Sequence, residues 1–471
     1  MFSLAVAGNQ RFIKEAPSRM AKKVLMITYA FPPIAVAGTQ RSLRFCRYLP
    51  ENGWFPVVLT IRVDRGRAND FALLKRIPPG VRISRTPTID FWRMYQKWSA
   101  REQKVVKGNQ DLREAGEERS KFRKARWLIT AKSIMKEFIT LPDHAVFWVP
   151  FALAYGAKIL LREKIDVIYT STPPHSQHIT GLLLSKLFRK PWIADFRDPW
   201  IGNFNYQGTS KIRESLEQFL EGKVIQNASK VMITSESWKQ NLLKRYPNTE
   251  EKVVVFYNGY DPALYETAPV ENFSKFTILY SGIFYRDLNP RFFLKAIRKW
   301  LNKSRRATED NFQILFFGPN SEDVKTEVAA NNLESVAKTC GVIPQDQLIP
   351  KQKGAHLLLL IVGFNEKLKG HVPAKVFEYM AAGRPILAII PDGETAGLLR
   401  GYGKAYMVNK ENEELVADIL DKAFNIFVNE SNNPLPYREV PCEKNVNRFN
   451  GREQTKRLAK IFTEASTASK K

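Results

Sequence analysis

Cysteine is scarce in this chain of 471 residues, which contains only Cys46, Cys340 and Cys442. Because the three are isolated and odd in number, the sequence gives no support to a disulfide framework or a cysteine zinc site, and it favours a reducing compartment. A paired Asp-x-Asp motif is also missing, and the five histidines are scattered. We therefore expect no resident metal ion.

Long apolar runs are rare as well. Residues 1–19 carry basic side chains but no apolar run, which excludes a secretory signal and predicts a flexible extension. The most apolar stretch, 145–161, falls slightly short of the roughly 20 residues that a membrane-spanning helix needs, and it contains Pro150, Gly156 and Lys158. We predict a buried helix there rather than a span.

Acidic residues are too few to balance the basic ones. Lys and Arg number 73 against 47 Asp and Glu, which gives a formal net charge of +26. Residues 1–200 alone carry a net charge of +19. A basic first half points to an anionic partner, and composition leaves open whether this is nucleic acid, a phosphorylated substrate or a membrane surface.

Strand and helix patterns alternate along most of the chain. Residues 22–29 form an apolar strand pattern, a glycine turn and a helical pattern follow, and 54–61 form the next strand pattern. Similar alternation continues to residue 257, so we predict a doubly wound α/β domain over 20–265. A second series gives a second such domain over 266–430, and the segment 431–471 is predicted to end in an amphipathic helix.

An insertion at about 92–140 interrupts the first series. It combines many charges with aromatic residues and has a basic stripe around 121–132. Two interpretations remain equal: a solvated helical insertion, or an interfacial helix with Trp and Arg at lipid headgroups.

Candidate site residues follow the predicted strands, because ligands of doubly wound sheets bind at the carboxyl ends of the strands. Gly282 would let the backbone approach a ligand closely, and Arg286 would clamp a phosphate. Gly318 ends another predicted strand. The alternative for the stretch 281–286 is an ordinary turn with a surface arginine.

The stretch 371–386 is the most informative part of the sequence. Pro373 suits a helix start, which places Lys375 in the first turn, where the helix dipole disfavours a cation unless an anion is bound. Glu378 lies on the same face one turn later. Two interpretations have equal support here. Lys375 and Glu378 form a surface ion pair, or they bind a nucleotide, the lysine through its diphosphate and the glutamate through its ribose.

This stretch resembles the nucleotide-sugar signature of glycosyltransferases of the GT-B fold, specifically family 4. Three further motifs resemble the family in the same order: Phe31-Pro32-Pro33 with Gly38, Asp195 to Trp200, and Asn258 to Asp261. The resemblance runs over residues 20–465. It implies an α/β fold of two doubly wound, Rossmann-like domains that face each other across a cleft, with the C-terminal helix returning to the N-terminal domain.

The resemblance also implies roles for individual residues. Those expected to bind the nucleotide-sugar are Gly282, Arg286, Gly318, Lys375 and Glu378. Those expected to be catalytic are His175 and Asp198. Those expected on the acceptor side or in the cleft loop are Gly38, Arg41 and Arg197. A packing or surface role remains an equal alternative for His175 and His178.

The sequence departs from the family pattern at three places. Gly370 stands where the family often has the first of two glutamates. Ala37-Gly38 replaces a double glycine. The lysine that usually follows the diphosphate arginine is not evident, and Asn289 and Arg291 occupy that neighbourhood.

The resulting prediction is a hexosyltransferase-like glycosyltransferase, retaining and metal-independent, that needs no cofactor and uses a nucleotide-sugar as co-substrate. Its acceptor is expected to be a glycan or lipid-linked molecule in bacterial cell-surface polysaccharide synthesis. Its expected location is cytoplasmic, with peripheral contact to the anionic inner face of the membrane. The alternative, prompted by Gly370, is a catalytically inactive nucleotide-binding or scaffold protein. Nucleic-acid binding ranks below both, because no recognised motif supports it.

Overall fold

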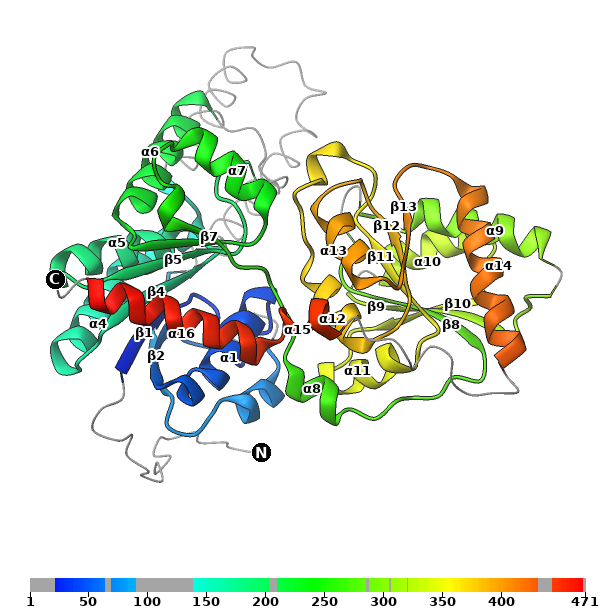
Figure 1. Cartoon of the computed structure of the whole chain (residues 1–471), viewed down its shortest axis with the longest axis horizontal. Coiled ribbons are helices and arrows are strands. Elements are labelled where there is room, and N and C mark those ends of the chain that lie inside the picture. The colour runs from blue at the N-terminus through cyan, green and yellow to red at the C-terminus, as the bar shows by residue number, and fades with distance from the viewer. Residues whose placement is uncertain are drawn as a thin grey trace, which may run out of the picture. The chain divides into compact units, whose positions relative to one another are not determined.

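The computed structural model divides into two compact units (Figure 1). The first comprises Met1–Phe196, Gln207–Val231 and Leu458–Lys471, and the second comprises Arg197–Tyr206 and Met232–Arg457. The structure describes residues 22–63, 69–89, 139–202, 210–284, 288–304, 306–319, 321–430 and 443–468. The predicted extension 1–19, nearly all of the insertion 92–140 and Arg286 lie outside the described residues.

The first sheet has seven strands in the order β3-β2-β1-β4-β5-β6-β7. Their bounds are β1 Lys22–Ile27, β2 Trp54–Ile61, β3 Arg82–Thr86, β4 Val167–Thr172, β5 Trp192–Phe196, β6 Lys230–Ile233 and β7 Val253–Val255. Strand β1 pairs in parallel with both β2 and β4. Because a central parallel strand is covered on both faces, β4 and β5 are buried at every position.

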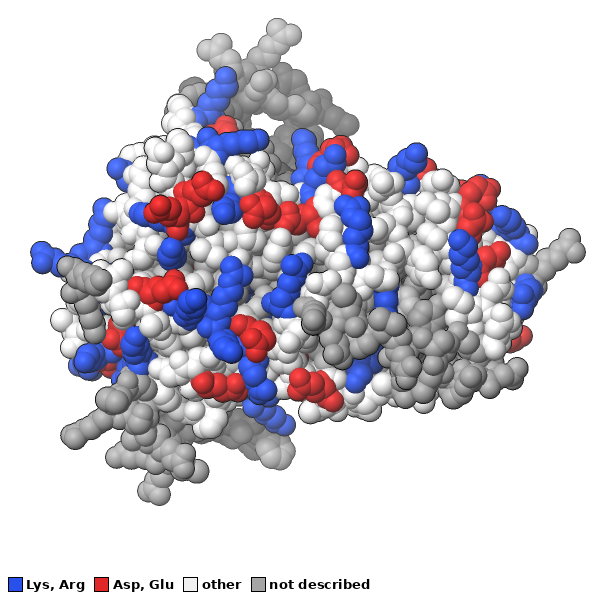
Figure 2. All heavy atoms as spheres, viewed as in Figure 1, with Lys and Arg blue, Asp and Glu red and all other residues white. Residues whose placement is uncertain are grey.

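Helices connect these strands. Their bounds are α1 Ala37–Tyr48, α4 Val149–Arg162, α5 Ser176–Phe188, α6 Lys211–Asn227 and α7 Glu236–Arg245. The last helix is α16, Gly451–Ala468. Figure 2 shows Lys and Arg side chains distributed over the visible face, with Asp and Glu side chains between them. The positive charge seen in the sequence is therefore spread over the folded surface.

The second sheet has six strands in the order β10-β9-β8-β11-β12-β13. Its strands are β8 Phe276–Ser281, β9 Phe312–Phe317, β10 Ala337–Gly341, β11 Leu357–Ile361, β12 Ile386–Ile389 and β13 Ala405–Val408. Its helices are α8 Pro262–Thr267, α9 Arg291–Lys303, α10 Ser321–Ala330, α11 Gln345–Gly354, α12 Ala374–Ala382, α13 Glu394–Tyr402, α14 Glu413–Glu430 and α15 Glu443–Asn447. Two apolar clusters, one for each face, enclose this sheet. The predicted fold of two doubly wound parallel sheets is confirmed.

The last helix returns to the first sheet, as predicted. The division between the units falls inside α16, and its second half packs in the first unit. There the Phe462 ring lies 5.3 Å from the Trp54 ring and 5.8 Å from the Tyr169 ring, both edge to face. Aromatic pairs of this geometry add to the free energy gained by apolar burial. The chain is thus fastened to its first domain by its final helix.

The crossover motif at 258–261 fits tightly against the start of α16. A Cβ atom at Gly259 would lie 2.2 Å from the Phe449 carbonyl oxygen. Tyr260 donates its backbone N–H to the same carbonyl oxygen at 3.1 Å. Only glycine fits here because the two backbones touch.

Helix α4 contains the apolar stretch noted in the sequence. With the preceding 3-10 turn it forms a segment, His144–Arg162, whose length and apolar composition would allow it to cross a membrane. A core helix of a folded domain can have the same length and composition. One stripe of α4 is buried, and at Gly156 an added Cβ would lie 2.5 Å from Leu184 of α5. The opposite side is open, and Leu161 is 77% exposed. The expected buried helix is thus buried along one stripe only.

The packing of α16 yields a stability prediction. Replacing the fully buried Phe462 by alanine leaves a cavity between Trp54 and Tyr169, so we expect a loss of about 3–5 kcal/mol in the free energy of unfolding. Urea denaturation followed by circular dichroism measures it. Thr467→Ala, on the exposed side of the same helix, should change stability by less than about 0.5 kcal/mol. Equal stability of both variants would show that α16 is not docked as described.

Candidate functional site

Two glycines meet at the carboxyl edge of the second sheet. Gly282 follows β8 with φ 143°, and Gly318 follows β9 with φ 158°. The Gly282 N–H donates to the Phe317 carbonyl at 2.8 Å, and a Cβ at Gly318 would lie 2.0 Å from the Gly282 carbonyl oxygen. At Gly318 backbone touches backbone, so a side chain there would displace the Gly282 turn.

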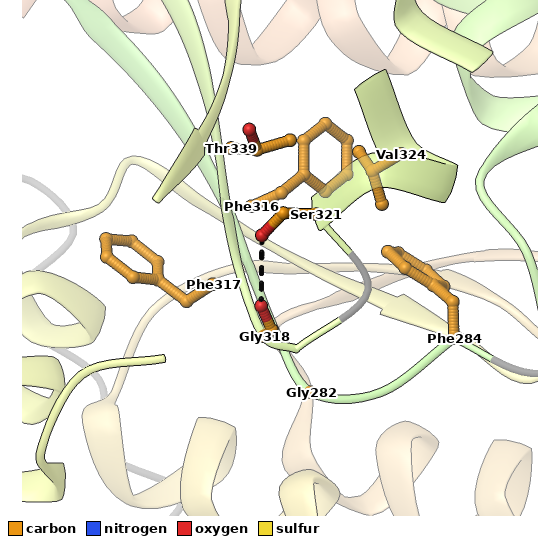
Figure 3. Close-up of a pocket in the computed structure, with 8 residues that line it drawn as sticks. All are labelled: Gly282, Phe284, Phe316, Phe317, Gly318, Ser321, Val324 and Thr339. Carbon is orange, nitrogen blue, oxygen red and sulfur yellow. Dashed lines mark hydrogen bonds between the residues drawn. The ribbon is translucent and has the colours of Figure 1, made fainter. Parts of the chain in front are cut away.

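A small pocket opens beside these glycines (Figure 3). Its wall is mostly aromatic and aliphatic, and the Ser321 hydroxyl, which donates to the Gly318 carbonyl at 3.5 Å, adds a polar point. The remaining lining residues are Phe284, Phe316, Phe317, Val324 and Thr339. Its free volume is about 10 Å³, which is room for about one water molecule, so in this structure the pocket is too small for the ring of an organic ligand.

The Lys375 side chain ends at the same turn. Its Nζ lies 2.9 Å from the Tyr280 hydroxyl and 4.1 Å from the centre of the Tyr280 ring, which stacks on Phe284. A Cβ at Gly282 would lie 2.4 Å from this Nζ, so glycine makes room for the ammonium. Among the described residues, no carboxylate lies within ion-pair distance of Lys375.

Burial lowers the pKa of Lys375 to about 7, although the nearby Glu378 carboxylate opposes this shift. The ammonium is therefore costly to keep charged in the absence of a strong counter-ion. An anion placed at the Gly282 turn would remove that cost. A buried lysine whose pKa is lowered in this way is a candidate functional residue.

Tyr379 fixes α12, which carries both Lys375 and Glu378, to the end of β8. Its hydroxyl accepts the Ser281 backbone N–H at 2.9 Å, and the Ser281 hydroxyl also accepts from Gln352 at 3.1 Å. The helix ends at Gly383, whose φ of 74° is the left-handed conformation that glycine adopts freely. Lys375 and Glu378 are thus held in fixed positions one helical turn apart.

Glu378 is partly exposed, and its charge acts on the surrounding tyrosines. Burial raises the pKa of Tyr265, and the Glu378 carboxylate raises it further. The structure therefore brings together four of the five residues expected to bind the nucleotide-sugar: Gly282, Gly318, Lys375 and Glu378. Arg286, the fifth, lies outside the described residues.

His371 lies just before α12 and shares its surroundings with a residue from a distant segment. Burial lowers the pKa of His371 to about 4, with the Asp198 charge opposing and the Lys375 charge reinforcing this shift. Asp198 itself pairs with Arg197 at 3.5 Å, and the Arg197 carbonyl accepts from Thr234 at 2.6 Å. Within the second unit, Asp198 and Lys375 are thus both within electrostatic reach of His371.

Gly370, where the family often has a glutamate, is packed against α7. A Cβ at this position would lie 3.0 Å from Ser237 and from the ring of Trp238. The Trp238 ring also lies 6.3 Å from the His371 ring. A glutamate would need Trp238 to move, so the departure is built into the packing.

Glu394, at the start of α13, was not among the expected residues. Its carboxylate accepts the backbone N–H groups of Glu236 at 2.9 Å and Ser237 at 3.1 Å, together with the Ser237 hydroxyl at 2.9 Å and the Tyr257 hydroxyl at 2.5 Å. It therefore occupies the N-terminus of α7, where the helix dipole favours an anion. Burial opposes ionisation, but these hydrogen bonds outweigh it and lower the pKa of Glu394.

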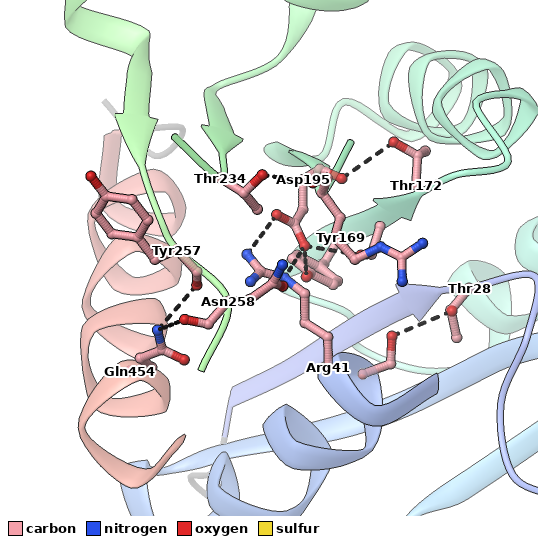
Figure 4. Close-up of polar contacts among 12 residues, drawn as sticks. Thr28, Arg41, Tyr169, Thr172, Asp195, Thr234, Tyr257, Asn258 and Gln454 are labelled. Atoms are coloured by element: carbon pink, nitrogen blue, oxygen red, sulfur yellow. Dashed lines mark hydrogen bonds and ion pairs between the residues drawn. The ribbon is translucent and has the colours of Figure 1, made fainter. Parts of the chain in front are cut away.

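The first unit holds a buried ion pair at the carboxyl edge of its sheet (Figure 4). Arg41 donates to the Asp195 carboxylate through Nε at 2.8 Å and Nη2 at 2.9 Å. Asp195 also accepts from Tyr169 at 2.5 Å and Ser171 at 2.9 Å. Arg41 is 2% exposed and Asp195 is fully buried, so the structure places Arg41 inside the unit, where it ties α1 to β5. Gly38, also expected in the cleft loop, lies partly exposed in the first turn of α1.

His175 stands at the start of α5. Its backbone N–H and that of Ser176 donate to the Asp143 carboxylate, and the Ser176 hydroxyl donates to the same group at 2.6 Å. An internal anion thus already fills this helix N-terminus. His178 lies between the hydroxyls of Thr170 and Thr172, and burial holds its pKa well below the ordinary value, so it is neutral.

Among the described residues, no group of three His, Cys, Asp or Glu side chains could hold a metal ion.

The comparisons with known proteins agree with this fold. A family model described as Glycosyltransferase Family 4 matches residues 118–264, so the resemblance to that family is confirmed over a segment that ends before α12. No curated protein sequence matches.

Solved structures match over nearly the whole chain. A glycosyltransferase from Rickettsia africae aligns with a TM-score of 0.60 at 14% identity, covering 94% of this chain and 98% of its own. Sucrose-phosphate synthase from Thermosynechococcus elongatus aligns with a TM-score of 0.61 at 15% identity, covering 95% of this chain and 100% of its own. HepE from Anabaena, solved with UDP and glucose, aligns with a TM-score of 0.59 at 12% identity, covering 94% of this chain and 100% of its own. These likenesses establish the GT-B architecture.

The Arg41–Asp195 pair gives a second stability prediction. Asp195→Asn leaves the buried guanidinium without its counter-charge, so we expect a loss of about 3–5 kcal/mol in the free energy of unfolding. The double change Arg41→Met with Asp195→Asn should cost less than the sum of the single changes. Arg400→Met, which breaks the exposed pair with Asp392, should cost at most about 1 kcal/mol. Additive losses in urea denaturation would argue against the coupling.

Glu394 gives a pH-dependent prediction. Its pKa is lower in the folded chain than in the unfolded one, so its stabilisation is present above the unfolded value of about 4.3 and is lost as pH falls through the folded value. We expect Glu394→Gln to lower the free energy of unfolding by about 1 kcal/mol at pH 7, a modest loss because the carboxylate is only half buried. In acid, the two proteins should become equally stable. Glu411→Gln, at an exposed position, is the control. Urea denaturation at several pH values measures this difference in stability. A difference that persists in acid would contradict the assignment.

Proposed function

We propose that this chain is a glycosyltransferase that moves a sugar from a nucleotide-sugar to a glycan or lipid-linked acceptor in cell-surface polysaccharide synthesis. The observation that carries the proposal is the Lys375 ammonium at the Gly282 turn, without a described carboxylate in ion-pair distance. The family match and the fold support the general class. The solved complexes of HepE with UDP and with UDP-glucose support a nucleotide-sugar as the donor.

The chemistry requires charge stabilisation more than covalent catalysis. The bond between the anomeric carbon and the diphosphate oxygen breaks, and its electron pair leaves with the nucleoside diphosphate. The acceptor hydroxyl oxygen forms the new bond to the anomeric carbon, and its proton passes to the departing diphosphate oxygen. Lys375 would stabilise the diphosphate charge as it develops, in a site of low hydration where one fixed cation has a large effect.

Glu378 lies one helical turn beyond Lys375, where its carboxylate would accept hydrogen bonds from the ribose hydroxyls. In this proposal Arg286 adds a second cation at the diphosphate. His175 and Asp198 are assigned to the reacting sugar by resemblance, as are retention of configuration and independence from metal ions.

A second candidate is a nucleotide-binding protein without transferase activity. The packing of Gly370 favours it, because Trp238 occupies the space that a family glutamate would use. Such a protein would bind nucleoside diphosphates through the same Lys375 and Glu378. Binding and turnover therefore need separate measurements.

Binding of nucleoside diphosphates, measured by calorimetry, tests the role of Lys375. We expect Lys375→Met to weaken binding by roughly tenfold to a hundredfold, because a charge-assisted contact is lost. Lys367→Met, at an exposed position before α12, should bind as the unchanged protein does. Equal affinity of the Lys375→Met variant would refute the assignment.

The pKa of Lys375 adds a pH signature to this binding. A bound diphosphate raises the pKa above its free value of about 7, so binding takes up a proton and weakens as pH rises above 7, by at most about tenfold per pH unit. The Lys375→Met variant should lack this part of the dependence. Proton uptake is measured from binding enthalpies in buffers with different ionisation enthalpies. Identical profiles for both proteins would contradict the assignment.

Turnover separates the two candidate functions. We expect purified protein to release nucleoside diphosphate from one member of a nucleotide-sugar panel, and Glu378→Ala to abolish this release. A thermal-shift panel first finds the donor, because binding raises the melting temperature. Binding without release, in the presence of lipid-linked acceptors, would favour the inactive protein.

A further inference from the structure

The helices α4, α5 and α6 of the first unit are unusually apolar on their open sides. Leucines at 161, 183 and 187 are 77%, 43% and 71% exposed. On α6, an apolar stripe recurs at helical spacing, with Ile212, Leu216 and Phe219 exposed by 66%, 38% and 59%. A helix that is apolar on its outer side, as well as on the side that packs on the sheet, is expected to contact another surface.

These side chains belong to neighbouring helices. α4 packs on α5 at Gly156, where an added Cβ would lie 2.5 Å from Leu184, and α5 in turn contacts α6. Figure 1 shows the three helices next to one another in the first unit. The exposed residues therefore share a layer, which we call the α4–α6 face. Exposed apolar surface gathered in this way marks an interaction site.

The α4–α6 face is positively charged, and this charge indicates which kind of partner it binds. Over the three helices, all within the described residues, the exposed basic side chains outnumber the single exposed acid, Glu214. The basic residues are Lys158, Arg162, Lys186, Lys211 and Lys223. The Lys223 ammonium lies 5.2 Å from the Phe219 ring, so charge and apolar surface are mixed at close range.

We infer that the α4–α6 face contacts an anionic lipid bilayer, with leucine and phenylalanine side chains entering the headgroup region and the lysines bound to lipid phosphates. Mixed apolar and basic surface is what interfacial binding requires. Two copies meeting through this face would oppose five cations to five, which disfavours a dimer. The inference adds a membrane surface to the proposed function without depending on it.

The first arm of the test removes the apolar contact. The full chain is floated with vesicles of phosphatidylcholine and phosphatidylglycerol in equal parts, and with vesicles of phosphatidylcholine alone. We expect binding to the anionic vesicles only. Leu187→Gln combined with Phe219→Gln should weaken it at least about tenfold, because two apolar side chains no longer enter the lipid. These positions are exposed, so the fold should be unchanged.

The second arm separates this face from general charge attraction. Lys186→Glu combined with Lys223→Glu should weaken binding by at least about tenfold, since each lysine near the surface contributes about fivefold. The matched control, Lys456→Glu combined with Lys460→Glu, makes the same charge change on α16, which is basic but has no large exposed apolar side chain. It should bind almost as the unchanged protein does.

Three results would overturn the inference. They are equal losses in the α16 control, no binding to either vesicle, and a dimer by light scattering that Leu187→Gln dissociates. The vesicles contain neither donor nor acceptor. A chain without transferase activity that still floats through this face would therefore refute the proposed function alone.

Discussion

The structure of the candidate site depends on a lysine ammonium pressed against a glycine backbone. Lys375 reaches the Gly282 turn only because that position has no Cβ, and Gly282 keeps its conformation because Gly318 leaves room for its carbonyl. Burial makes the charged form of this lysine costly, and a bound anion would relieve the cost. Helix α12, the two glycine loops and the aromatic pocket can all be understood as support for that one cation.

Each unit also contains an anion that the fold has already neutralised. Asp195 is satisfied by Arg41 and Tyr169, and Glu394 by the first amides of α7. Carboxylates held by several hydrogen bonds or an ion pair fix the elements they join, so their loss is expected to lower stability rather than ligand binding. Lys375 differs from them because no described carboxylate lies within ion-pair distance of its ammonium, although the charge of Glu378 acts on it.

The two units differ in what their surfaces offer. In the second unit, the residues assigned to the donor gather near the loops that follow β8 and β9, as expected at the carboxyl edge of a parallel sheet. In the first unit, the notable surface is a layer of helices whose outer sides combine leucine with lysine. A transferase with a lipid-linked acceptor would need both, one to hold a soluble donor and one to stay near its acceptor.

The sequence alone was sufficient for the fold, because strands such as 54–61 and 312–317 are short, mostly apolar runs whose pattern and length are local properties. It also predicted Lys375 and Glu378 as neighbours, since both lie on one short helix. It did not reveal that Arg41 is buried against Asp195, that Trp238 fills the space beside Gly370, or that Glu394 caps α7. Those contacts join residues from over a hundred to more than 150 positions apart, and only the packing of the folded chain decides which distant side chains share a space.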